Sequence, residues 1–167
     1  MPKRLLIYDV DESFQGVFLR QKERDLLFSA SPQVRHCIGC FGCWIKTPGR
    51  CVIQDRCAVM PSYLAQANEV VIVSPMVYGG YSPNVKAVLD RSIGYLLPYF
   101  RIISHEMHHR MRVQNPFALN VYFYGECNEA ERRVAGRLVQ ANAVNFGAGS
   151  YSVHFNDSID EITEVLF

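Results

Sequence analysis

The sequence predicts an α/β fold, in which helices cover both faces of a doubly wound sheet of five parallel strands. Two observations support this prediction. Short apolar runs alternate along the chain with longer stretches in which apolar residues recur at helical spacing. The run Glu69–Ser74 (EVVIVS) has a wholly apolar, β-branched centre, which is typical of a strand buried on both faces. We therefore expect Glu69–Ser74 at the centre of the sheet.

The remaining elements follow from the same patterns. The other expected strands are Lys3–Val10, Asp25–Ala30, Phe117–Tyr124 and Tyr151–Phe155. The expected helices are Ala58–Ala67, Pro83–Tyr95, Asn128–Asn145 and Asp160–Leu166. On the long third helix, one side is expected to carry Val134, Leu138 and Ala141. Five strands in a chain of this length suit the flavodoxin-like order 2-1-3-4-5, whose ligands bind beyond the carboxyl ends of the strands. The loops after Val10, Ser74 and Tyr124 should therefore line the site.

Length and composition indicate which classes of protein and partner to expect. The 167 residues are expected to form one domain, 1–167, with a cysteine-rich loop inserted at 36–57. The net charge of +1 argues against nucleic acid or an anionic membrane as a partner. No run approaches the ~18 apolar residues of a membrane span, and the N-terminal apolar run is too short for a signal peptide. We expect a cytoplasmic protein, whose six cysteines are thiols or ligands rather than disulfides.

The cysteine-rich segment His36–Asp55 carries the strongest functional pattern. Its spacing is C-x2-C-x2-C-x7-C, formed by Cys37, Cys40, Cys43 and Cys51. Two-residue gaps let a tight loop aim successive sulfurs at one point, as a metal ion or an iron–sulfur cluster requires. Free thiols that pack as small apolar groups are the alternative interpretation. The two remaining cysteines, Cys57 and Cys127, do not belong to this set.

The loop after Ser74 is the second candidate site. A planar ligand needs close approach to the backbone, which glycine permits, and an apolar or aromatic wall against its face. The candidate binding residues are Ser74, Pro75, Met76, Val77, Tyr78, Gly79 and Gly80, with Tyr124 and Gly125 as a second wall. The alternative is an ordinary strand-to-helix turn with Tyr78 on the surface.

These two segments resemble the NADPH-dependent FMN reductase and iron–sulfur flavoprotein group of flavodoxin-like proteins. In that group a strand ends in S-P-x-Y-[FW]-G and a helix with K-x-x-x-D-R follows. The matching residues are Ser74, Pro75, Tyr78, Gly79, Lys86, Asp90 and Arg91. Val77 stands where the group often has tyrosine. Upstream, the group has C-x-G-C-x-x-C closed by G-x-C-x-x-x-D. The matching residues there are Cys37, Gly39, Cys40, Cys43, Gly49, Cys51 and Asp55.

The resemblance implies FMN on the 74–80 loop and electron transfer from NAD(P)H or a ferredoxin-like donor to a small-molecule acceptor. It also implies a homodimer or homotetramer. In the iron–sulfur branch, cysteines at the four matching positions bind a [4Fe-4S] cluster that passes electrons to the flavin, although many relatives keep the pattern without a cluster. The alternative is a flavodoxin-fold module that has lost FMN and acts as a cysteine-rich metal-binding or redox-sensing protein.

The segment after the first strand departs from the family. Relatives have G-S-P-R-x-x-G-N-T there, whose amides and hydroxyls cradle the FMN phosphate. This chain has Asp9, Asp11 and Glu12, with no glycine before Gly16. Each carboxylate ~4 Å from a phosphate charge would cost about 1 kcal/mol in water and about 4 kcal/mol at an effective dielectric constant of 20. Either the phosphate is held elsewhere or FMN binding has been lost.

Two other patterns match unrelated sites. The acids after the first strand resemble those of a receiver domain, but that fold needs an aspartate where this chain has Ser74. The segment His105–His109 formally matches the zinc motif H-E-x-x-H, yet it has no sustained amphipathic frame. We interpret it as a solvated basic segment, or as an anion-binding one through Arg101, Arg110 and Arg112.

Overall fold

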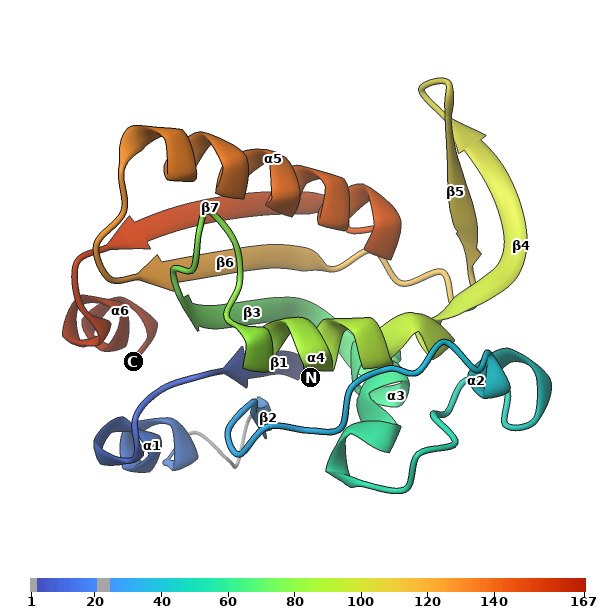
Figure 1. Cartoon of the computed structure of the whole chain (residues 1–167), viewed down its shortest axis with the longest axis horizontal. Helices are drawn as coiled ribbons and strands as arrows, with labels where there is room; N and C mark the ends of the chain where they lie inside the picture. The colour runs from blue at the N-terminus through green and yellow to red at the C-terminus, as the bar shows by residue number, and fades with distance from the viewer. Residues whose placement is uncertain (1–2, 21–24) are drawn as a thin grey trace.

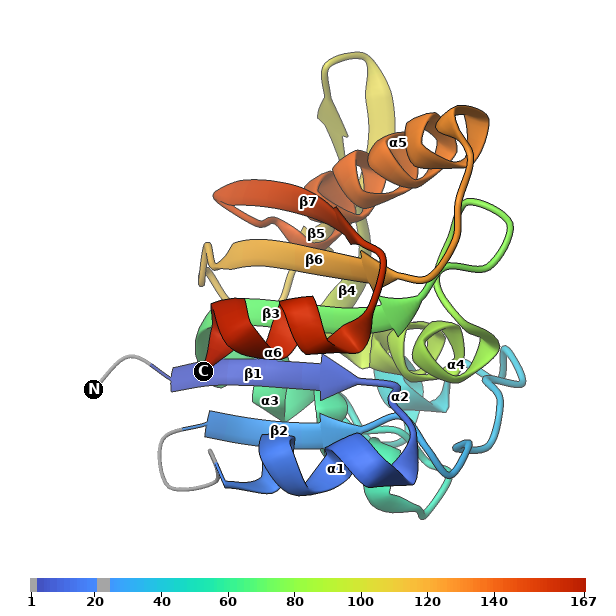
Figure 2. The ribbon, with the colours of Figure 1, turned by 90° about the vertical axis from the view of Figure 1, so that its left-hand side faces the viewer.

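The computed structural model describes residues 3–20 and 25–167. Its main sheet contains β1 (Lys3–Tyr8), β2 (Asp25–Ser29), β3 (Ala67–Pro75), β6 (Ala118–Tyr124) and β7 (Ser150–Asn156). The order is β2-β1-β3-β6-β7 and every pairing is parallel, as Figure 2 shows. Counting these five strands alone gives the order 2-1-3-4-5, so the predicted doubly wound flavodoxin-like sheet is confirmed.

Strand β3 is central because both of its faces are covered. Its residues Val70–Val73 are almost fully buried. One face of the sheet is covered by α1 (Glu12–Leu19) and α6 (Ile159–Leu166), which lie in front of it in Figure 2. The other face is covered by α3 (Met60–Gln66), α4 (Pro83–Arg91) and α5 (Glu129–Phe146). The chain thus buries one apolar layer on each side of the sheet.

The long helix α5 turns a different side inward from the one expected. Its buried residues are Ala135, Val139 and Ala143, whereas Val134 and Ala141 are exposed and Leu138 is only partly buried. Residues four apart lie on one side of a helix, and small side chains let the helix pack closely on the sheet. The helix begins next to the predicted start, Asn128, which forms a capping box with Glu131.

A second, two-stranded sheet follows α4 and was not predicted. Helix α4 ends at Arg91, a 3₁₀ turn covers Ser92–Tyr95, and the antiparallel strands β4 (Leu96–Ile103) and β5 (Glu106–Met111) project beyond the main sheet (Figure 1). The H-E-x-x-H segment therefore lies in a hairpin rather than on a helix. A further short helix, α2 (Gly42–Ile45), lies in the cysteine-rich segment. None of the described helices is long and apolar enough to cross a membrane.

Candidate functional site

A cavity of about 310 Å³ opens beyond the carboxyl ends of the strands. It lies where the chain order reverses, between β1 and β3, which is the point where sheets of this type bind ligands. The lining residues are Asp9, Val10, Asp11, Glu12, Gln15, Ser31, Pro75, Asn84 and Tyr124. The loop after β1, the last residues of β3 and β6 and the start of α4 thus meet around one space, whereas residues 76–80 of the loop after β3 do not line it. We call this space the switch-point cavity.

A buried carboxylate organises this cavity. The Asp9 carboxylate accepts hydrogen bonds from Ser82 Oγ at 2.6 Å and from Asn84 Nδ2 at 3.2 Å. The Tyr124 hydroxyl donates to the backbone oxygen of Asp9 at 2.7 Å. Ser82 also caps α4, and its N–H donates to Ser74 Oγ at 2.9 Å. These bonds join the ends of β1, β3 and β6 to the start of α4, so the cavity wall is pre-organised.

The cavity is negatively charged at one end. Asp11 is the N-cap of α1 and Glu12 lies in its first turn, and both side chains are exposed. Burial raises the pKa of Tyr124 well above its usual range, and the nearby carboxylates of Asp9 and Asp11 raise it further. Pro75 and Tyr124 are the two lining residues with ring side chains. The acidic end does not suit the phosphate of FMN, because the described lining includes three carboxylates and no Lys, Arg or His.

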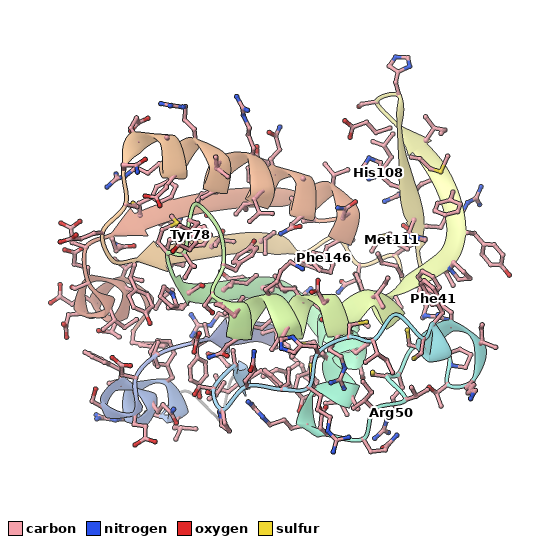
Figure 3. The ribbon with its side chains drawn as sticks, in the orientation of Figure 1. Phe41, Arg50, Tyr78, His108, Met111 and Phe146 are labelled. Carbon is pink, nitrogen blue, oxygen red and sulfur yellow. The ribbon has the colours of Figure 1, made fainter. Side chains whose placement is uncertain are left out.

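The predicted binding loop lies to one side of the cavity. Val77 and Gly80 exchange backbone hydrogen bonds of 3.1 and 3.0 Å around Tyr78 and Gly79, whose φ angles are +49° and +78°. Tyr78 is 92% exposed, and Figure 3 shows it beside α5. A Cβ on Gly79 would lie 3.0 Å from the Cβ of Val134, so only glycine allows this approach to α5. The tip of the loop therefore packs on a helix.

Among the predicted binding residues, Pro75 and Tyr124 line the switch-point cavity. Ser74 is buried and supports it through Ser82. The others lie outside its lining: Met76, Val77, Tyr78, Gly79, Gly80 and Gly125. Three lining residues were not singled out in the sequence at all: Gln15, Ser31 and Asn84. Their polar side chains carry no motif, and only the folded loops bring them together.

The four predicted cysteines line a second cavity, of about 80 Å³, which we call the cysteine cavity. Its other lining residues are Ile38, Gly39, Phe41, Val52, Ile53, Arg91 and Ile93. Cys37 and Cys40 are exposed, Cys43 and Cys51 are buried, and all are free thiols. Burial raises the pKa of Cys43, and the nearness of the other three thiols raises it further. Among residues 3–20 and 25–167, however, no three Cys, His, Asp or Glu side chains are grouped as ligands of a metal ion.

Arg91 closes the cysteine cavity from inside the protein. Its side chain is fully buried, and its Nε donates to Cys51 Sγ at 3.0 Å. Its two terminal nitrogens donate to the Asp55 carboxylate at 2.9 and 2.8 Å and to the backbone oxygens of Arg35 and Ile53 at 2.8 and 3.1 Å. The hydrogen bond from Arg91 holds the pKa of Asp55 below its usual range. The two family-like motifs therefore meet in space, which their separation in sequence did not reveal.

Helix α4 connects the two cavities. Asn84 lines the switch-point cavity and Arg91 lines the cysteine cavity. Seven residues separate them, which corresponds to about 10 Å along the helix. Trp44, in the same cysteine-rich segment, donates from Nε1 to Leu96 O at 2.9 Å, and the centroids of the Trp44 and His109 rings lie 5.0 Å apart. These contacts attach the cysteine-rich segment to the base of the β4–β5 hairpin, near the labelled Phe41 in Figure 3.

One curated protein resembles this chain over part of its length. No protein-family model matches the sequence. An iron–sulfur flavoprotein of Methanocaldococcus jannaschii is 29% identical over 83 residues, which are 50% of this chain and 42% of that protein. The chain thus matches less than half of the length of this curated relative. The match agrees with the resemblance that the motifs predicted.

Solved structures share the fold over almost the whole chain. General stress protein 14 of Treponema denticola, in complex with FMN, has a TM-score of 0.58 at 11% identity and covers 98% of this chain and 91% of its own. The NAD(P)H:quinone oxidoreductase of Methanothermobacter marburgensis has a TM-score of 0.57 at 10% identity, and the match covers 99% of this chain and 93% of that one. The FMN-dependent NADH-azoreductase of Bacillus anthracis has a TM-score of 0.53 at 14% identity, and the match covers 98% of this chain and 93% of that one. The chain therefore has the flavodoxin-like fold and resembles an iron–sulfur flavoprotein in sequence.

Proposed function

We propose that this protein is a flavin-dependent oxidoreductase that moves electrons from NAD(P)H or a ferredoxin-like donor to a small-molecule acceptor. The observation that carries the proposal is the cavity at the β1/β3 switch point, the place where flavodoxin-like sheets bind FMN. The similarity to an iron–sulfur flavoprotein and to structures that contain FMN supports it.

The chain would contribute binding and orientation, and a bound flavin would supply the redox chemistry. Pro75 and Tyr124 would enclose the ring from the ends of β3 and β6. Asp9 would act as a positioning residue, because both of its carboxylate oxygens hold the start of α4 in place. With these bonds formed before ligand arrives, little free energy is spent on ordering the site.

We further propose that Cys37, Cys40, Cys43 and Cys51 hold a [4Fe-4S] cluster. Four thiolates are the usual ligands of such a cluster, and the four side chains line one cavity with apolar walls. A cluster there would pass single electrons to or from the flavin. The hydrogen bond from Arg91 to Cys51 is of the kind that tunes a cluster's reduction potential.

A homodimer or homotetramer is part of the proposal. The projecting hairpin exposes Tyr99, Phe100, Ile102 and Met107, each by more than half. An isolated two-stranded sheet is only marginally stable in water, so a second copy packed on this ribbon would stabilise it. Size-exclusion chromatography with light scattering should then give at least twice the 19.0 kDa chain mass.

The flavin proposal is tested by spectroscopy and titration. Protein purified without oxygen should show flavin absorbance, or should quench the fluorescence of added flavin. Tyr124→Ala removes one wall of the cavity and should weaken flavin binding about tenfold, or about 1.4 kcal/mol. Tyr122→Ala is the matched control, because Tyr122 lies on the same strand and does not line the cavity. Absence of any flavin binding would refute the proposal.

A second candidate is a flavin-free, cysteine-rich metal-binding or redox-sensing protein. The acidic end of the switch-point cavity and the shared cysteine cavity favour it. Metal analysis of the same preparation distinguishes the two candidates. A preparation with stoichiometric metal and no affinity for any flavin would support this second function.

A further inference from the structure

The acidic end of the switch-point cavity has a specific architecture. Asp11 and Glu12 begin α1, and among the described residues the Asp11 side chain makes no hydrogen bond to the N–H groups of that helix. Asp11 is therefore free to act on a ligand in the cavity, and the exposed Glu12 side chain lines the same space. Asp9 differs, because Ser82 and Asn84 already occupy its two oxygens.

This position is where the fold normally attracts an anion. The N-terminus of a helix carries a partial positive charge and unpaired N–H groups, so it is a ready phosphate site. In this chain two carboxylates supply the negative charge at that helix end themselves. A phosphate placed there would meet like charge from both. The connection Asp9–Asp11 also contains no glycine that could wrap its N–H groups around a phosphate.

We propose that this cavity selects an unphosphorylated flavin, of which riboflavin is the simplest, over FMN, and that Asp11 and Glu12 determine this selectivity. The inference rests on the proposed flavin function and specifies its ligand. Riboflavin presents the same ring to Pro75 and Tyr124. Its side chain ends in a hydroxyl where FMN has a phosphate, and a hydroxyl can donate a hydrogen bond to a carboxylate.

The test compares two ligands on three proteins by fluorescence titration at low ionic strength. The wild-type protein should bind riboflavin at least tenfold more tightly than FMN, or by about 1.4 kcal/mol. In the double variant Asp11→Ser, Glu12→Asn, FMN binding should tighten at least tenfold while riboflavin binding changes little. The control Asp160→Ser, Glu164→Asn makes the same change in net charge on α6, away from the lining of the cavity. It should keep the wild-type preference.

Each result is decisive. Equal binding of the two flavins, or tighter binding of FMN, by the wild-type protein would overturn the selectivity and leave the flavin function standing. A preference that survives in the Asp11, Glu12 variant would overturn the assignment to these residues. Binding of neither flavin would overturn the function and the selectivity together. Raising the salt concentration should reduce the wild-type preference, because exposed charges are screened.

Discussion

Replacing Arg91 by methionine should destabilise the protein more than any single surface change. Methionine keeps a long, flexible apolar chain but has no donor. The substitution therefore removes the hydrogen bond to Cys51, both bonds to Asp55, and the bonds to two backbone oxygens. The Asp55 carboxylate would keep its bond from the Cys57 N–H, at 3.0 Å.

The expected cost follows from the burial of this pair. Breaking a buried ion pair by removing one partner costs about 3–5 kcal/mol, because the other charge is left uncompensated. The Arg91 side chain is 0% exposed and that of Asp55 is 20% exposed, so water can reach the carboxylate in part. We therefore expect the lower end, about 3 kcal/mol, which lowers the melting temperature of a domain of this size by roughly 6–12 °C.

Urea denaturation followed by fluorescence measures this loss. Trp44, the one tryptophan of the chain, lies in the cysteine-rich segment and reports on it directly. Lys86→Met is the matched control on the same helix. Lys86 pairs with Asp90 at the surface, where the two side chains are 56% and 47% exposed, so its loss should cost no more than about 0.5 kcal/mol.

A double-mutant cycle separates the pair from other effects. Adding Asp55→Asn to Arg91→Met should cost much less than the sum of the two single changes, because the second change removes the uncompensated charge. If Arg91→Met costs no more than Lys86→Met, or if the two changes at positions 91 and 55 are additive, then the bonds of Arg91 do not stabilise the fold as argued.

Three further outcomes are expected. The pKa of Asp55 is lower in the folded than in the unfolded protein, so the ionised carboxylate stabilises the fold fully above the unfolded pKa of 3.8. This stabilisation is lost as the pH falls through the folded pKa. Urea denaturation should therefore show that the difference in unfolding free energy between wild type and Asp55→Asn shrinks below about pH 4. Gly79→Ala should cost about 1–3 kcal/mol in thermal unfolding, since φ is +78° and Val134 leaves no room; an unchanged melting temperature would contradict this packing. Anaerobic protein should contain about four irons, and Cys40→Ser should lose them while Cys127→Ser keeps them; iron retained in Cys40→Ser would exclude the proposed ligand set.

The sequence alone determined the sheet and the place of its candidate site. Strands such as β3 are found from local composition, because a buried parallel strand must be apolar at every position. The order of the strands follows from short, right-handed connections, and that order places the site at the switch point. The cysteine spacing predicted four sulfurs around one metal or cluster, and the structure brings the four cysteines to one cavity without grouping them as ligands among the described residues.

The tertiary structure decided the features that depend on distant neighbours. The β4–β5 hairpin was missed because most of its large side chains are exposed and its turn, Ser104-His105, lacks glycine. The inward side of α5 depends on how closely the helix approaches the sheet. The tip of the Tyr78 loop packs on that helix instead of lining the cavity, and Arg91 reaches Cys51 across 40 residues. Periodicity records which residues avoid water, whereas the partner that each side chain meets is set only when the elements pack.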